Sequence, residues 1–189
     1  MTGATMAAAQ EADPGPEAAP APDAPAPTAE PVDDWLDSLA ESRDAAEAYT
    51  LERLIWTAWL SYDGEAEGVA EAMDRGNRLM RASRLEEAEA AFAEAIEGDP
   101  AYAEAWNRRA TVRYLRGDYA GSIADIRAVL ALQPRHFGAL SGLGLCLVAL
   151  DRPADALDAF EAGLDVHPFM PGPRAQVDRL REILSGDPI

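Results

Sequence analysis

The chain has 189 residues, 48% of them hydrophobic, and a formal net charge of −18 that arises from 34 acidic residues against 16 arginines. That hydrophobic content is enough to bury a core. An acidic surface repels the phosphate backbone, so the composition argues against broad nucleic-acid binding, and a single cysteine excludes an intramolecular disulfide.

The first segment, residues 1–32, is an acidic linker rich in alanine and proline, with seven prolines before residue 32. Such a composition cannot bury enough surface to fold, so the sequence predicts disorder here. Residues 1–68 contain 15 acidic and 2 basic residues, a net charge of −13, which leaves −5 for residues 69–189. The plain interpretation is a spacer, and the alternative is a regulatory or partner-binding tail.

The start of the chain bears on its location. No charged leader or apolar run of signal-peptide length precedes the linker, which predicts a cytoplasmic protein. Ala7-Ala8-Ala9 resembles the end of a cleavage site, however, so the alternative is a periplasmic protein whose signal peptide was lost to a misplaced start. The apolar run Leu143–Leu150 is far too short to span a bilayer, and a membrane location is not expected.

Residues 33–68 are predicted to form N-terminal capping helices. Asp33 and Asp34 are helix-start residues, and a second helix is expected from about Asp44 to Leu60. The apolar face of that second helix is predicted to contain Leu51, Leu54, Ile55, Ala58 and Tyr62, with Trp56 and Trp59 beside them. This hairpin is expected to cover the open end of the following repeats, and the alternative is an aromatic surface that docks on a partner or a membrane.

Prolines at a fixed spacing indicate an internal repeat, because Pro100, Pro134 and Pro168 are 34 residues apart. The units are residues 69–102, 103–136 and 137–170, which together make the segment 69–170. Each unit reads as two apolar-periodic helices around a turn. Small residues are predicted to face bulky ones inside each hairpin, pairing Gly76, Ala110 and Gly144 with Phe92, Ile126 and Phe160. One hairpin cannot bury such a face alone, so the units are expected to stack.

The last segment, residues 171–189, is predicted to hold a C-terminal capping helix and a tail. Pro171-Gly172-Pro173 is expected to break the chain before a helix from Arg174 to Leu184. Its packed face is predicted to contain Val177, Leu180 and Leu184, and its outward face is polar, as a terminal element requires.

The three units resemble the tetratricopeptide repeat (TPR) family, which places Leu-Gly, Ala, Phe and Pro at matching offsets. The resemblance covers Val69–Met170 and implies an all-α fold, a right-handed superhelical solenoid of helical hairpins with capping helices at both ends. The middle unit departs from the pattern with Arg109 and Arg113, so a partly buried ion pair from Arg109 to Asp125 is expected, the alternative being that these arginines belong to a site. The chain also resembles a group of alphaproteobacterial TPR proteins in the runs WNRRATVRYLRGDY, ADI and PRHFGALSGLG. That resemblance adds an exported location to the expectations.

Catalytic and metal-binding patterns are weak in this sequence. Cys146 lies in an apolar helix and reads as a buried structural thiol. His136 and His167 come from repeat ends, and no cluster of metal ligands accompanies them. Acidic pairs such as Glu86-Glu87 fit the start of a solvated helix. We therefore predict no enzymatic activity, no metal and no cofactor.

The TPR resemblance implies a concave face lined by the first helix of each hairpin. The predicted peptide-binding residues are Asn77, Met80, Arg81, Asn107, Arg108, Thr111, Tyr114, Leu145 and Val148. Amides there can pair with a peptide backbone, arginines with carboxylates, and aliphatic residues with an apolar side chain. Some family members clamp a C-terminal carboxylate with a Lys-Asn, Asn, Lys-Arg set. Only Asn77 matches that set, because the other places hold Met73, Arg108, Gly138 and Gly142.

These observations predict a non-enzymatic scaffold or adaptor that binds an extended, partly acidic peptide in the groove. The expected partner is a protein or peptide, without nucleic acid or small-molecule substrate. The alternative is a structural subunit of a larger assembly that docks through the Trp-rich N-terminal helices. An exposed patch at Trp56 and Trp59 would favour the subunit, and a covered one would favour the groove.

Overall fold

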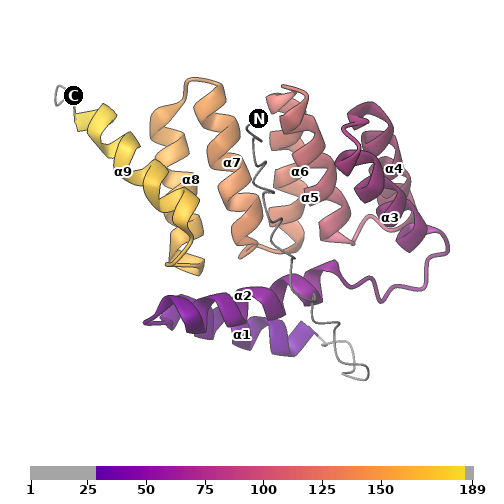
Figure 1. The fold of residues 1–189 in the computed structure, drawn as a ribbon, viewed down its shortest axis with the longest axis horizontal. Coiled ribbons are helices and arrows are strands. Elements are labelled where there is room, and N and C mark those ends of the chain that lie inside the picture. Colours follow the sequence, from indigo (N-terminus) through magenta and orange to yellow (C-terminus); the bar gives the residue numbers. More distant parts are fainter. Residues whose placement is uncertain (1–28, 186–189) are drawn as a thin grey trace, which may run out of the picture.

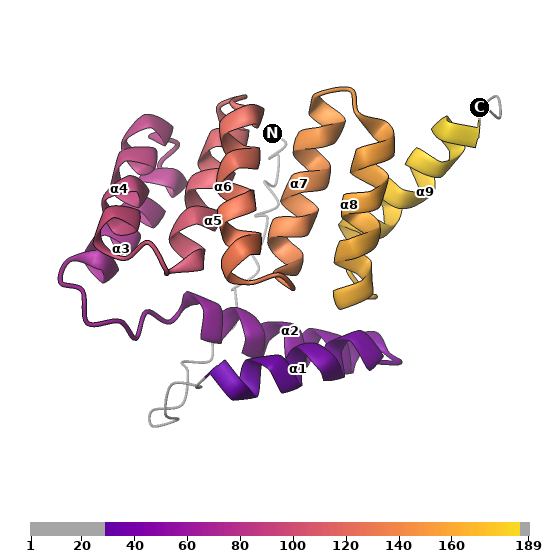
Figure 2. The same ribbon diagram turned by 180° about the vertical axis from the view of Figure 1, so that it is seen from behind.

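The computed structural model describes residues 29–185, and its regular structure within that range is all helical (Figure 1). The helices are α1 (Ala29–Glu41), α2 (Ala45–Leu60), α3 (Val69–Arg81), α4 (Leu85–Gly98), α5 (Ala103–Leu115), α6 (Tyr119–Leu132), α7 (Phe137–Ala149), α8 (Pro153–Val166) and α9 (Pro171–Ser185). Helices α3 to α8 form three hairpins in a row that α9 closes, which confirms the predicted solenoid (Figure 2). Most of the predicted linker, with Ala7-Ala8-Ala9, lies outside the described residues.

The 34-residue period of the sequence is also the period of the helices. First helices begin at residues 69, 103 and 137, α9 begins at residue 171, and second helices begin at residues 85, 119 and 153. Each first helix packs on its own second helix, and each second helix packs on the first helix of the next unit. Stacking therefore buries the face that a single hairpin would leave open to water.

The turn inside each hairpin places one residue in the left-handed region at an equivalent position, namely Ser83 (φ 57°), Gly117 (φ 79°) and Asp151 (φ 54°). A left-handed residue after a helix lets the next amide bond back to a carbonyl of the last turn. The Asp118 N–H accordingly donates to the Arg113 carbonyl at 2.9 Å. The turn thus ends the first helix and starts the second at the same place in every unit.

Small residues and aromatic rings interlock inside the hairpins, as the repeat alignment predicted. A Cβ atom on Gly76 would lie 2.5 Å from the Phe92 ring, and one on Gly144 would lie 2.6 Å from the Phe160 ring. Both rings are fully buried. The glycines are therefore required by the close approach of the rings, since a side chain at either position would displace a packed ring.

The N-terminal hairpin lies along one edge of the repeat row and does not stack on its open end at α3 (Figures 1 and 2). Trp59 stacks on His136 with ring centroids 4.1 Å apart, and Trp56 lies edge-on to Phe137 at 5.5 Å. The predicted position over the open end is therefore wrong. Aromatic groups at the turn into the third repeat offer an apolar partner, whereas the exposed side of α3 is largely charged.

The bounds of α1 and α2 correct two details of the prediction. Helix α1 begins at Ala29 and not at Asp33, because a proline such as Pro31 is tolerated in a first turn, where its missing N–H has no helical partner. Helix α2 begins as predicted, with the Asp44 carboxylate accepting two backbone N–H groups at 2.9 Å. Leu54, expected on its apolar face, is instead exposed.

Helix α9 packs on α8 as α5 packs on α4, with Val177 and Leu180 buried. It begins at Pro171, so the Pro-Gly-Pro sequence forms its first turn and does not break the chain. Leu184, predicted on the packed face, is exposed at the end of the helix. The period of the repeats therefore continues into this terminal helix.

Candidate functional site

The predicted groove face is the surface formed by the nine peptide-binding residues named above, on α3, α5 and α7. Arg81, Thr111 and Val148 are exposed, and the others are partly buried, namely Asn77, Met80, Asn107, Arg108, Tyr114 and Leu145. Every member is thus at least partly open to solvent. Some of these side chains already form hydrogen bonds or ion pairs within the described part of the protein, and others do not.

Arg81 is an exposed cation of the groove face. It lies in the last turn of α3, and no carboxylate of residues 31–185 forms an ion pair with it. An arginine in this state can donate to a carboxylate of another molecule without giving up an existing bond.

Asn107 and Arg108 are engaged by a buried carboxylate on their own helix. The Glu104 side chain is 1% exposed, the Asn107 amide donates to its Oε2 at 2.9 Å, and the Arg108 Nε lies 2.7 Å from its Oε1. The Nε2 atom of His136 lies 3.5 Å from the same carboxylate. A carboxylate removed from water needs such partners, so both predicted groove residues have a structural task. Sequence analysis missed Glu104, although its spacing of four from Arg108 was a usable signal.

Apolar side chains are exposed at the ends of α5, α7 and α9, beside the groove face. Leu115 is 55% exposed and Val148 is 40% exposed, and Ile183 of α9, at the position equivalent to Leu115, is 50% exposed. Tyr114 packs beside Tyr119 with ring centroids 5.6 Å apart. The predicted cap at residues 171–189 does not include Ile183 among its exposed apolar residues. The continuation of the 34-residue period past residue 171 was the signal that could have found it.

The arginines that break the repeat pattern form an ion-pair network between the first two repeats. Arg109 donates to both oxygens of Asp125, at 2.9 and 2.8 Å, and Arg113 lies 3.0 Å from the same carboxylate. Arg113 also donates to Glu89 of α4 at 2.8 Å, and Arg116 pairs with Glu89. Burial opposes the ionisation of Glu89, but the two arginines outweigh it and hold its pKa below the usual range. The expected ion pair from Arg109 to Asp125 is confirmed.

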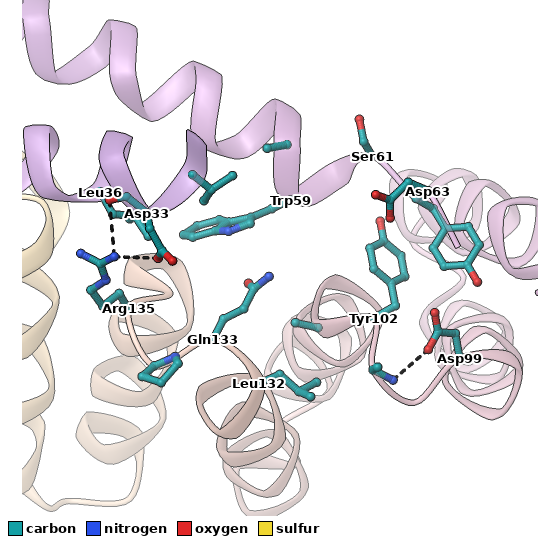
Figure 3. A pocket seen from close by; sticks show the side chains of 16 residues that line it. Asp33, Leu36, Trp59, Ser61, Asp63, Asp99, Tyr102, Leu132, Gln133 and Arg135 are labelled. Atoms are coloured by element: carbon teal, nitrogen blue, oxygen red, sulfur yellow. Dashed lines mark hydrogen bonds and ion pairs between the residues drawn. The ribbon is translucent and has the colours of Figure 1, made fainter. Parts of the chain in front are cut away.

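A pocket lies between the α1–α2 hairpin and the turns that join the repeats, and we call it the junction pocket (Figure 3). Its volume is about 620 Å³, and its walls come from the start of α1, the end of α2 with the next loop, and the turns before α5 and α7. Tyr62 and Tyr102 stand side by side in one wall, with ring centroids 5.0 Å apart, and Trp59 lines another. The Gln133 amide points toward Trp59 (Figure 3).

The charges around the junction pocket are mainly negative. Asp33, Asp63 and Asp99 line it, and Arg135 is the cation among its lining residues within the described range. Arg135 is held by Asp33 at 2.7 Å and by Asp37. Burial raises the pKa of the Tyr102 phenol, with a further contribution from the nearby Glu104 carboxylate. The Tyr102 hydroxyl donates to the Leu60 carbonyl at 3.0 Å and so ties the end of α2 to the turn before α5.

Residues 31–185 do not bring together a metal-binding group of side chains. Cys146 is buried, burial raises the pKa of its thiol, and its Sγ lies 3.3 Å from the Ser122 hydroxyl. No set of three His, Cys, Asp or Glu side chains in this range could hold a metal ion. Across the described helices, none has both the length and the apolar character needed to cross a membrane.

Comparison with known proteins decides the family. The tetratricopeptide repeat model matches residues 73–134 and 116–171. A TPR repeat-containing protein of Rhizobium etli is 34% identical over 156 residues, which cover 82% of this chain and 76% of the relative. The chain belongs to the tetratricopeptide repeat family. The helical hairpins of the structure are thus TPR units in sequence as well as in shape.

Solved TPR structures share the fold. The first TPR of Spaghetti (RPAP3), bound to the HSP90 peptide SRMEEVD, gives a TM-score of 0.63 at 17% identity and covers 67% of this chain and 100% of its own. The second TPR domain of human RPAP3, in complex with the HSP70 peptide SGPTIEEVD, gives a TM-score of 0.56 at 20% identity and covers 60% and 98%. TPR domains are protein-interaction modules, and at these identities the likeness extends to the fold alone.

Proposed function

We propose that this TPR protein is a non-enzymatic adaptor whose groove face binds an extended peptide that carries an acidic residue and an apolar side chain. The observation that carries the proposal is the state of Arg81, an exposed guanidinium that pairs with no carboxylate of residues 31–185. Peptides held by the two RPAP3 domains contain adjacent glutamates near their ends, which accords with an acidic ligand.

The apolar requirement follows from Leu115 and Val148, which are large, exposed and on neighbouring first helices. Their burial by a peptide side chain would remove apolar surface from water. Asn107 and Arg108 already hold Glu104, so the acidic contact is assigned to Arg81. With one charge-assisted contact and one apolar contact, we expect a Kd in the micromolar range, about −8 kcal/mol.

The test is a peptide-array or phage-display selection against the full chain, followed by binding measurements on the enriched peptides. Arg81→Ala and Val148→Asp are expected to weaken binding, and added salt is expected to weaken it further by screening the Arg81 contact. Arg127→Ala is the matched control, because Arg127 is exposed on a second helix and pairs with no residue of the described range. Enrichment of basic peptides, or binding that ignores both groove substitutions, would refute the proposal.

The alternative of a structural subunit docking through the N-terminal tryptophans receives less support. Trp59 is 6% exposed. Trp56 lies so close to Gly138 that a Cβ atom there would be 2.8 Å from its ring. Trp59 is thus buried and Trp56 is partly buried against the third repeat, and a covered patch is the state expected for a groove-binding adaptor.

A further inference from the structure

We propose that the junction pocket is a second binding site, separate from the groove face, for an alkylammonium or alkylguanidinium group. Such a group is supplied either by a free amine or by a lysine or arginine side chain of a peptide. The pocket volume of about 620 Å³ is within the ordinary range for sites that enclose small ligands.

The charge of the pocket selects a cation. Arg135 is already neutralised by Asp33 and Asp37, so it offers no free positive charge to an anion. Asp99 accepts the Ala101 N–H and lies beside the Tyr62 phenol, and Asp63 has no hydrogen bond or ion pair with residues 31–185. Two carboxylates without a cationic partner therefore give the pocket a negative potential, which attracts a positively charged ligand.

The aromatic walls favour the same class of ligand. Tyr62 and Tyr102 line the pocket side by side, and Trp59 lines it from the end of α2. A cation over such a ring is attracted by its quadrupole, and the aliphatic stem of the cation can pack on the ring. A hydrated metal ion would gain nothing from these rings.

An unpaired acceptor on the partly buried Gln133 favours a cation that also carries N–H groups. The Oε1 atom of Gln133 is inaccessible to solvent and has no hydrogen-bond partner within the described chain. An unpaired buried carbonyl costs about 1–3 kcal/mol, so it marks a place where a donor belongs. Figure 3 shows this amide directed into the space below Trp59. An alkylammonium or alkylguanidinium group has both the positive charge and the N–H donors, whereas a quaternary ammonium has only the charge.

The experiment uses the full ¹⁵N-labelled chain titrated by NMR with n-butylammonium and n-butylguanidinium. Neutral n-butylurea tests the charge, and tetramethylammonium tests the N–H donors. We expect saturable shifts of the Trp59 indole N–H and of the amides of the pocket with the first two probes, and weaker effects with the controls. Acetyl-Gly-Arg-Gly-amide separates the two sources, because tighter binding than n-butylguanidinium identifies a peptide side chain and weaker binding identifies a free amine.

Substitutions localise the site. Asp63→Asn is expected to weaken binding by about threefold or more, since it removes one solvent-accessible charge pair. Asp74→Asn is the matched control, an equally exposed aspartate outside the pocket, and Arg81→Ala tests independence from the groove. Gln133→Leu is expected to weaken the binding of n-butylammonium and n-butylguanidinium more than the binding of tetramethylammonium. Shifts centred elsewhere, binding of n-butylurea equal to that of n-butylguanidinium, or identical affinities of the Asp63→Asn and Asp74→Asn variants would each overturn the proposal.

Discussion

Asp125→Ala tests the ion-pair network of the middle repeat. The substitution removes the carboxylate that accepts from Arg109 at 2.9 and 2.8 Å and lies 3.0 Å from Arg113. Breaking a buried ion pair by removing one partner costs about 3–5 kcal/mol. Arg109 is 15% exposed, and Arg113 keeps Glu89. We therefore expect a loss of about 2–4 kcal/mol in the free energy of unfolding, since both cations keep some compensation.

The measurement is urea denaturation followed by circular dichroism and by tryptophan fluorescence, whose transitions must coincide for a single free energy to be defined. In thermal unfolding the same loss corresponds to a fall in Tm of roughly 5 to 15 °C. A loss under about 1 kcal/mol would refute the reasoning, because the removal of a deeply buried carboxylate leaves its arginine partners uncompensated and should cost more than that.

The third repeat supplies the control for this experiment. It has Leu143 and Ala159 at the positions equivalent to Arg109 and Asp125. The double variant Arg109→Leu/Asp125→Ala therefore reproduces a pairing that the fold already accepts. We expect it to recover at least about half of the stability lost in Asp125→Ala, since apolar replacement of both partners of a buried pair is often neutral. A double variant less stable than the single one would show that the cost lies in packing and not in the orphaned charge.

Other predictions concern the core, pH and the first residues. Phe160→Ala, and likewise Phe92→Ala, is expected to cost about 3–5 kcal/mol in urea denaturation, because each ring fills a hairpin interior. The folded-state pKa of Glu89 is lowered, so its contribution to stability is present above the ordinary carboxyl pKa and is lost as pH falls through the folded value. Glu89→Gln is therefore expected to flatten the fall in unfolding free energy below about pH 4.3. Deleting residues 1–28, which precede α1, is expected to leave Tm and helicity nearly unchanged by circular dichroism.

The helices that contain the predicted groove residues could be located from sequence, but the state of those side chains could not. Residue spacing placed Asn77, Arg81, Asn107 and Arg108 on first helices, and the structure agrees with that placement. Periodicity does not report which polar group is already paired, however, and Glu104 engages two of the four. Pairing depends on three-dimensional distances of a few ångströms, which a one-dimensional pattern does not contain.

The sequence alone was sufficient for the repeat architecture, because a solenoid is built from contacts between neighbours at a constant period. Pro100, Pro134 and Pro168 recorded that period, and every helix from α3 to α9 begins in register with it. The position of the N-terminal hairpin required the tertiary structure. Its apolar face specified that it must be buried, but a hydrophobic face is not directional, and its partner at His136 and Phe137 is some 80 residues away in the chain. The junction pocket exists only because of that long-range docking, so no local pattern could have predicted it.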